Sequence, residues 1–161
     1  MTITPNQVAF LAMLRNSEGT DKAPNAYAVT FGNQYTITDF RDHPSVLGLW
    51  DGLPLDFLGP QYAGLKSTAA GAYQFIKPTW LGCRAKLALP DFSPASQDQA
   101  ALYLIGQAGA LDAIEAGNLD AAVAACRHIW ASLPGGAAGQ PHATADALAQ
   151  IFVANGGVLA A

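Results

Sequence analysis

The segment Arg15-Asn16-Ser17-Glu18-Gly19-Thr20-Asp21 marks the point where a predicted amphipathic helix ends in a glutamate. Carbonyl groups at the end of a helix carry partial negative charge, which disfavours a carboxylate and raises its pKa. Gly19 is a natural helix stop and leaves Glu18 at a corner between helix and loop. A carboxyl that stays protonated near neutral pH suits general acid catalysis, although a helix end also fits a solvated surface residue.

The residues before this segment predict the helix that carries Glu18. Thr4-Pro5-Asn6-Gln7 has the features of a helix start, with a threonine cap, a proline at the first helical position and a glutamine that can close a capping box. Val8, Leu11 and Leu14 follow as one apolar stripe at helical spacing. We therefore expect a buried helix that holds Glu18 rigidly.

Composition and charge predict a single domain that spans residues 1–161. Apolar side chains make up 51% of the 161 residues and charged side chains 12%, which is far from the composition of disorder. The net charge of −4 argues against nucleic acid as the main partner. Residues 1–86 carry seven of the eight basic residues and six of the twelve acids, whereas residues 87–161 carry Arg127 and six acids. An anionic ligand should therefore meet the first half.

The remaining counts predict neither a membrane span nor a metal or cofactor. The N-terminus lacks the basic and apolar regions of a signal peptide, and no run of about 18 apolar residues occurs, so we expect synthesis in the cytoplasm and no membrane insertion. Cys83 and Cys126 lie in helix-like apolar stretches and should be buried. His43, His128 and His142 show no metal-ligand spacing, so no metal site is expected.

A change of period from helical to alternating predicts a β-hairpin over residues 27–37, with Gly32-Asn33 as its turn. The segment Thr38–Pro44 then forms a second turn. Its carboxylates, Asp39 and Asp42, can either face a cleft or hold the turn through local backbone bonds, and turn formation is the more common role.

Residues 49–64 are rich in glycine, proline and aromatic residues and show no clear period, which predicts a long loop or flap. Loops of this length in compact domains are commonly functional or mobile. The aromatic side chains of this loop can stack on a ligand or close the edge of the core.

The segment Lys66–Phe75 combines small residues with clustered hydroxyl and amide groups. Ser67, Thr68, Tyr73 and Gln74 can pair with sugar hydroxyls and N-acetyl groups, while the small residues permit close backbone approach. The same segment also fits the capped start of a helix, and the residues alone do not separate the two interpretations.

The rest of the chain predicts helices that pack mostly on each other, with Trp80 and Trp130 in the core. A glycine-rich loop over residues 134–140 ends at Gln140 and precedes the last helix. The predicted helices cover residues 78–87, 93–105, 110–116, 119–131 and 142–153.

Five blocks, in this order along the chain, resemble the family of endolysins to which the lytic enzyme of bacteriophage lambda belongs. They are residues 18–21, 38–44, 66–74, 91–98 and 129–135. The resemblance covers nearly the whole chain. It implies an α+β, lysozyme-like fold with a small β-hairpin or sheet lobe, a mainly helical lobe and a sugar-binding cleft between them, so that residues 1–161 form a single lysozyme-like catalytic domain.

The resemblance also implies the activity of a peptidoglycan lytic transglycosylase. Such an enzyme cleaves the β-1,4 bond between N-acetylmuramic acid and N-acetylglucosamine and leaves a 1,6-anhydromuramoyl end. The family uses one glutamate for proton transfer, which by position is Glu18. Gln74 lies in a block similar to the Gly-x-x-Gln stretch of other lytic transglycosylases. The expected substrate contacts are Ser67, Thr68, Tyr73, Gln74 and Gln140.

Two other functions remain open at this stage. A hydrolytic muramidase or chitinase would need a second carboxylate, for which Asp21, Asp39 and Asp42 are the candidates. A catalytically weak wall-binding module is the third possibility, against which the helix-end Glu18 argues. The expected partner is a glycan strand of peptidoglycan. We expect a monomer that needs a holin-like pore or a secretion machine to reach the cell wall in the periplasm.

Overall fold

The computed structural model describes residues 3–136 and 143–161. The chain divides into two compact units, the first formed by Met1–Lys22 and Ala101–Ala161 and the second by Ala23–Ala100. Helix α3 (Pro94–Gln107) crosses the boundary and contributes residues to both units. The expectation of one domain over residues 1–161 therefore stays a prediction.

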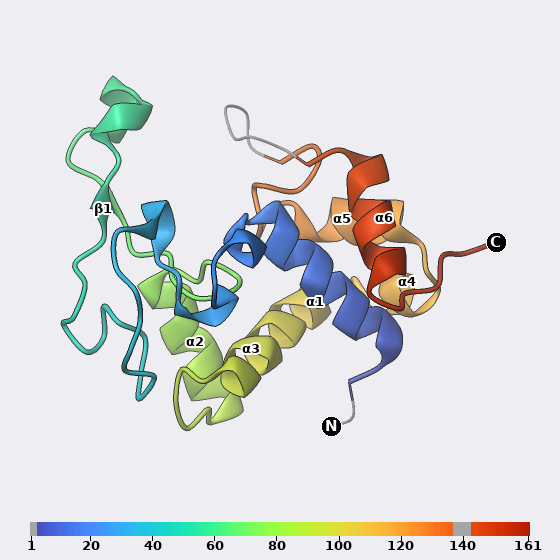
Figure 1. The fold of residues 1–161 in the computed structure, drawn as a ribbon, viewed down its shortest axis with the longest axis horizontal. Helices are drawn as coiled ribbons and strands as arrows, with labels where there is room; N and C mark the ends of the chain where they lie inside the picture. The colour runs from blue at the N-terminus through green and yellow to red at the C-terminus, as the bar shows by residue number, and fades with distance from the viewer. Residues whose placement is uncertain (1–2, 137–142) are drawn as a thin grey trace. The chain divides into compact units, whose positions relative to one another are not determined.

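The first unit is helical. Helix α1 (Pro5–Ser17) packs beside α6 (Ala145–Ala154) and also against α4 (Leu111–Glu115), which in turn contacts α5 (Leu119–Cys126) (Figure 1). The core of this unit is built from fully buried side chains, which include Phe10, Met13, Leu14, Ile114, Leu133, Leu148 and Phe152.

The predicted start of α1 is confirmed. Thr4 Oγ1 accepts a hydrogen bond from Gln7 N at 3.2 Å, and Gln7 Oε1 accepts one from Thr4 N at 3.3 Å, which together form a capping box. Pro5 occupies the first helical position. These contacts satisfy backbone donors that a helix start otherwise leaves without partners.

The predicted apolar stripe of α1 is correct at Leu11 and Leu14 and wrong at Val8. Leu11 and Leu14 are buried, whereas Val8 is 46% exposed. The buried face is centred on Phe10, Met13 and Leu14, and Val8 lies about 200° around the helix from Phe10 because each residue turns the helix by about 100°. The helix is still anchored firmly in the core.

Asn6 links the start of α1 to the end of the chain. Its side-chain amide donates to Ile114 O at 2.9 Å, and its Oδ1 accepts from Val158 N at 2.9 Å. Ala160 N donates to Gly117 O at 3.1 Å, and a Cβ added to Gly117 would lie 2.3 Å from Val158 O. The C-terminal residues are therefore held closely along α1 and α4.

The second unit contains a two-stranded antiparallel sheet, formed by β1 (Leu53–Pro54) and β2 (Lys66–Ser67), with Leu53 opposite Ser67. The expected loop over residues 49–64 is thus only partly irregular, because it contains β1 and two short helices. The short 3-10 helices of the chain cover Thr20–Lys22, Ala26–Ala28, Phe31–Asn33, Asp56–Leu58 and Pro60–Tyr62.

The hairpin predicted over residues 27–37 is confirmed in part, since its two arms share one antiparallel bridge and the hydrogen bond from Ile37 N to Ala28 O at 2.8 Å. The segment turns at Gly32 and Asn33 as expected, but only a single antiparallel bridge joins Val29 and Thr36. Its first arm also pairs with a distant segment, because Phe31 N donates to Ala69 O at 2.8 Å and Gly71 N donates to Val29 O at 2.7 Å. The segment with the alternating pattern therefore bonds both across its own turn and to residues 69–71.

An aromatic cluster forms the core of the second unit around α2 (Lys77–Leu87). Trp80 is fully buried and contacts Phe92 edge to face, with ring centroids 4.6 Å apart. Phe92 contacts His43 in the same way at 5.1 Å. The expected burial of Trp80 and Trp130, and of both cysteines, is confirmed.

The predicted helices are present with two differences at their ends. The helix expected over residues 119–131 ends at Cys126, and turns replace its last part, since Ile129 N and Trp130 N both donate to Cys126 O. His128, Ile129 and Trp130 have weak helix propensity, which favours this early end. The last helix begins at Ala145, and the start expected near residue 142 lies outside the described residues.

Candidate active site

Glu18 lies at the C-terminal end of α1, as the sequence predicts. Its backbone N–H donates to Leu14 O at 2.9 Å, which closes the last turn of the helix. Gly19 follows with φ of 71°, a left-handed conformation that favours glycine, and Gly19 N donates to Asn16 O at 2.9 Å. The glycine stop is therefore confirmed, and it places the Glu18 side chain where helix and loop meet.

The Glu18 carboxyl is partly buried and contacts two serines in series. Ser132 Oγ donates to Glu18 Oε1 at 2.5 Å, and Ser17 Oγ donates to Ser132 Oγ at 3.0 Å. Burial raises the pKa of Glu18, and the weaker effect of the Ser132 hydrogen bond lowers it. The sequence argument attributed a raised pKa to the helix end, whereas burial is the larger cause in the structure.

Ser132 projects from a tight turn that its neighbours fix in place. Trp130 and Leu133 on either side of it are 3% and 0% exposed, and Leu133 N donates to Trp130 O at 3.1 Å. A Cβ added to Gly136 would lie 2.2 Å from Ala131 O, so the turn requires glycine there. No role was predicted from the sequence for Ser17 or Ser132, although both lie in segments that were singled out. For Ser17, a hydroxyl next to the proposed acid was a usable signal of a contact.

Asp21 shares the first unit with Glu18. Its carboxylate is exposed, and its Oδ2 accepts a hydrogen bond from Asn16 Nδ2 at 2.7 Å.

Asp39 and Asp42 lie in the second unit, and each has a basic partner. Asp39 pairs with Arg41 at 2.6 Å, and this hydrogen bond lowers the pKa of Asp39. Asp42 is 5% exposed, accepts from Trp80 Nε1 at 2.8 Å and forms an ion pair with Arg84. These contacts account for both carboxylates as supports of the turn and of α2.

Ser67 and Thr68 are partly exposed, and both hydroxyls contact the backbone. Ser67 Oγ accepts from Ala69 N at 3.3 Å, and Thr68 Oγ1 accepts from Lys77 N, the first residue of α2, at 2.9 Å. Thr68 thus caps α2 from a distance, as in the alternative interpretation of this segment. Each hydroxyl still has a proton that can be donated to a ligand.

Tyr73 and Gln74 differ in their surroundings. Tyr73 is 1% exposed, and its hydroxyl donates to Asp98 Oδ1 at 2.5 Å, which leaves no free surface for a sugar. Gln74 is partly exposed and has φ of 52°, an uncommon conformation for a residue with a side chain. Its Nε2 donates to Gly71 O at 3.0 Å. Strained backbone of this kind clusters at functional sites.

The buried side chain of Gln97 holds the turn formed by residues 71–73. Its Oε1 accepts from Ala72 N at 2.8 Å, and its Nε2 donates to Phe92 O at 2.8 Å and to Tyr27 O at 3.1 Å. Gln97 is fully buried. This side chain is therefore a rigid support for the segment that presents Gln74.

The other predicted contact, Gln140, lies outside the described residues. Over residues 3–136 and 143–161, no group of three His, Cys, Asp or Glu side chains is placed to hold a metal ion. Over the same residues, no helix has the length and hydropathy needed to cross a bilayer.

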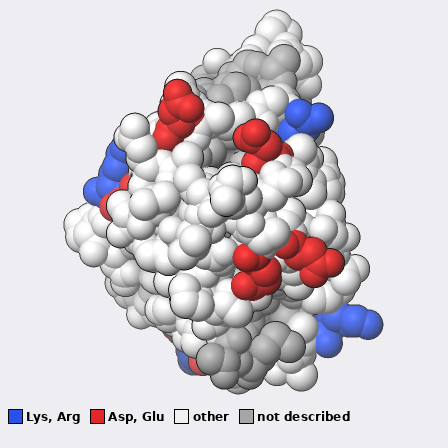
Figure 2. Space-filling model, turned by 90° about the vertical axis from the view of Figure 1, so that its right-hand side faces the viewer, with Lys and Arg blue, Asp and Glu red and all other residues white. Residues whose placement is uncertain are grey.

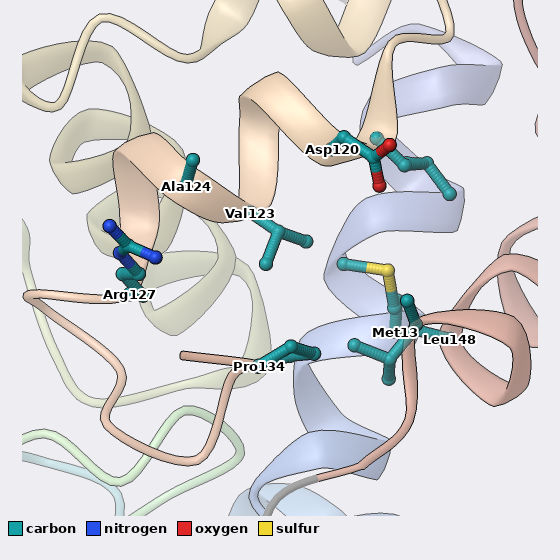
Figure 3. A pocket seen from close by; sticks show the side chains of 9 residues that line it. Met13, Asp120, Val123, Ala124, Arg127, Pro134 and Leu148 are labelled. Atoms are coloured by element: carbon teal, nitrogen blue, oxygen red, sulfur yellow. The ribbon is translucent and has the colours of Figure 1, made fainter. Parts of the chain in front are cut away.

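A pocket of about 180 Å³ lies elsewhere in the first unit (Figure 3). Its wall is mostly apolar, with Met13, Val123 and Leu148 pointing toward its centre and Asp120 and Arg127 at its edges. Glu18 and Ser132 do not line it.

Acidic side chains spread over the face of the molecule that Figure 2 shows, with basic side chains mostly toward its margin. The helices α4, α5 and α6 carry the exposed acids Asp112, Glu115, Asp120 and Asp146. Such a surface repels polyanions, and the absence of a nucleic-acid partner stays a prediction.

Comparison with known proteins gives matches over nearly the whole chain. A family model described as Endolysin matches residues 8–159. The endolysin of Escherichia phage P2 is 42% identical over 161 residues, covering 95% of this chain and 94% of the relative. The endolysin of Escherichia phage lambda is 41% identical over 162 residues, covering 98% and 95%.

The fold gives the same result. The structure of bacteriophage lambda lysozyme complexed with a chitohexasaccharide matches with a TM-score of 0.85 and 40% identity over 99% of both chains. A second structure of lambda lysozyme matches with a TM-score of 0.82 and 38% identity, again over 99% of both. The expected α+β, lysozyme-like fold is confirmed.

Proposed function

The chain belongs to the endolysin family and is an enzyme that degrades peptidoglycan, and we propose that it does so as a lytic transglycosylase with Glu18 as general acid and base. The observation that carries this proposal is the state of Glu18, a partly buried carboxyl with a raised pKa whose side-chain partner is a neutral hydroxyl. A carboxyl with a raised pKa keeps its proton to higher pH than an ordinary glutamate and can release it to a substrate.

The reaction needs two proton transfers at the same carboxyl. Protonated Glu18 gives its proton to the glycosidic oxygen as the bond from that oxygen to C1 of the muramoyl residue breaks. The resulting carboxylate then accepts the proton of the muramoyl 6-hydroxyl while that oxygen bonds to C1. The product is a 1,6-anhydromuramoyl end, and Glu18 returns to its protonated state.

The contacts of the other carboxylates support a mechanism with one acid. Hydrolytic glycosidases of either stereochemistry commonly use two carboxylates. Asp21 is exposed and bonded to Asn16, and Asp39 is paired with Arg41. Asp42 is buried, pairs with Arg84 and accepts a hydrogen bond from Trp80 Nε1. All three have structural partners that a catalytic role would disturb.

Glycan strands are the proposed substrate. The related lambda lysozyme has been solved with a bound chitohexasaccharide, which supports binding of β-1,4-linked amino sugars by this chain too. Gln74, Ser67 and Thr68 are partly exposed and can contact sugar hydroxyl and amide groups. Tyr73 supports this segment from the core, and contact by Gln140 stays a prediction.

The chemistry of the muramoyl end tests the proposal. Digested peptidoglycan is analysed by mass spectrometry, and each cleavage should give a fragment that is one water lighter than the hydrolysed glycan and has no reducing end. The 6-hydroxyl belongs to the same ring as C1, so proximity favours it over water. Hydrated, reducing ends would overturn the transglycosylase proposal and favour a hydrolytic muramidase, to be followed by Asp→Asn exchange at positions 21, 39 and 42.

Removal of the acid is the second test. Glu18→Gln keeps the shape of the side chain but cannot donate a carboxyl proton, so activity should fall by about 10²–10⁴. Glu115→Gln is the matched control because Glu115 is the other glutamate and accepts a hydrogen bond from Thr4 Oγ1, which a glutamine can also accept. Full activity of Glu18→Gln would refute the assignment. A wall-binding module without catalysis is set aside, because the relatives are endolysins and lysozymes.

We also propose how the enzyme is organised and how it reaches its substrate. Both units act as one catalytic domain over residues 1–161, and the protein is a monomer made in the host cytoplasm. It acts on the cell wall and depends on a holin-like pore or a secretion machine for access. Light scattering gives the oligomeric state, a single unfolding transition supports one domain, and lysis that occurs only with a co-expressed pore supports the access route.

A further inference from the structure

Two hydroxyl groups form a directed chain that ends at Glu18. Ser17 Oγ donates to Ser132 Oγ at 3.0 Å, and Ser132 Oγ donates to Glu18 Oε1 at 2.5 Å. A hydroxyl carries one proton, so Ser132 can donate to Glu18 only because it accepts rather than donates in its contact with Ser17. When Ser132 donates to the carboxyl, both bonds therefore run toward Glu18.

Both serines are held by rigid backbone. Ser17 is the last residue of α1, whose preceding turn contains the fully buried Met13 and Leu14. Ser132 lies between the buried residues Trp130 and Leu133. The positions of the two hydroxyls are thus set by the core of the first unit.

We propose that Ser132 is the positioning residue of Glu18, with Ser17 as its outer support, and that it reserves Glu18 Oε2 for the proton exchanged with substrate. The inference rests on the proposed function. Because Oε1 accepts the Ser132 hydrogen bond, the acidic proton lies on Oε2, and Oε2 delivers it to the glycosidic oxygen. The negative charge left on the carboxylate is stabilised by Ser132, since hydrogen bonds to charged groups are stronger than neutral ones. The proton of the muramoyl 6-hydroxyl then returns to Oε2.

Charged neighbours do not explain the raised pKa of Glu18. Arg15 and Asp21 are the charged residues of its own segment, and Arg127 and His128 are the basic or titratable residues before the Ser132 turn. The causes of its shifted pKa are burial and the Ser132 hydrogen bond. Ser132 is therefore the contact of Glu18 in the first unit whose substitution should shift the pKa of Glu18 in a predictable direction.

The test compares pH profiles of kcat and KM for serine variants on purified peptidoglycan. Ser132→Ala should lower kcat about tenfold with little change in KM, because it removes a hydrogen bond to a group that becomes charged in the reaction. It should also move the descending limb of the profile to higher pH, since loss of the donor destabilises the carboxylate and raises the pKa of Glu18. Ser132→Thr keeps a hydroxyl and should restore both the rate and the limb.

Ser17→Ala should shift the limb in the same direction by less, because Ser17 acts on Glu18 only through Ser132. Ser45→Ala is the matched control, since Ser45 Oγ is buried without a hydrogen-bond partner among the described residues, and this variant should leave the profile unchanged.

The outcomes separate this inference from the proposed function. A Ser132→Ala variant with wild-type kcat and an unmoved limb, beside an inactive Glu18→Gln, would overturn the positioning role and leave the acid assignment intact. An active Glu18→Gln would overturn both. If Ser132→Ala does not fold, Ser17→Ala decides the matter, and an unshifted limb in that variant overturns the proposal.

Discussion

Gly71→Ala should destabilise the protein severely, and the structure indicates by how much. A Cβ at this position would lie 2.2 Å from Gln97 Oε1 and 2.9 Å from Phe92 Cζ, and φ is 79°. The left-handed backbone alone costs about 1–2 kcal/mol for a residue with a side chain. Displacement of Gln97 breaks its three hydrogen bonds, two buried and one partly buried, each worth about 1 kcal/mol. The sum, about 4–5 kcal/mol, is a large part of a typical stability of about 5–15 kcal/mol.

A double-mutant cycle with Gln97→Ala measures this coupling. Gln97→Ala loses the same hydrogen bonds but makes room for the new methyl group, so the double variant should cost only about 1–2 kcal/mol more than Gln97→Ala. Urea denaturation followed by tryptophan fluorescence gives the free energy of unfolding of all four proteins, since Trp80 contacts Phe92 in this core. Additive effects, within about 0.5 kcal/mol, would refute the reasoning.

Three further predictions follow from burial and charge. Burial raises the pKa of Glu18, so the native state binds this proton more tightly than the unfolded state does, and stability falls as pH rises from the ordinary glutamate pKa through the raised one. Glu18→Gln should therefore unfold at a higher temperature than wild type at neutral pH, and the difference should vanish in acid. Equal Tm values at pH 7 would contradict this prediction. Asp42→Asn should lower stability by about 2–4 kcal/mol because Arg84 loses its carboxylate partner, while the digest keeps its anhydro ends in mass spectra. Burial raises the pKa of Cys126 to about 12, so a thiol reagent at pH 8 should label it only after denaturation, and rapid labelling of the native protein would disagree.

The helices could be predicted from the sequence because their signals are local. Thr4 and Asn118 each accept a hydrogen bond from the first turn of a helix, as their residue types and positions suggest. Gly19 ends α1 in a left-handed backbone conformation, which the presence of a glycine by itself favours. In each case the information lies within a few residues of the feature that it determines.

The pairing of residues 27–37 with residues 69–71 could not be predicted because the partner is distant in sequence. Thr30 closes the turn through its own side chain, which accepts from Tyr35 N at 3.0 Å, while the neighbouring backbone bonds to residues 69–71. Strands of two residues, such as β1 and β2, also carry no detectable period. Local patterns suggested strands but not their partners.

The candidate site was predicted in part for the same reason. Glu18 stands out as a helix-end acid, whereas Ser132 reaches it across 114 residues of chain. Tyr73 matched the polar pattern of a sugar-contacting segment, but its side chain is buried against Asp98. A residue type indicates what a side chain can do, and only the fold decides which way it points.

The attachment of the C-terminal residues to Asn6 has a consequence for the construction of chimeric lytic enzymes. Val158 N donates to Asn6 in the first turn of α1, and Glu18 lies at the other end of this helix. The C-terminal residues therefore hold the N-terminal end of α1 in place. A targeting module spliced in place of the last residues would loosen that end. A module fused through a flexible spacer after Ala161 would leave the bond between Val158 and Asn6 intact and should preserve lytic activity.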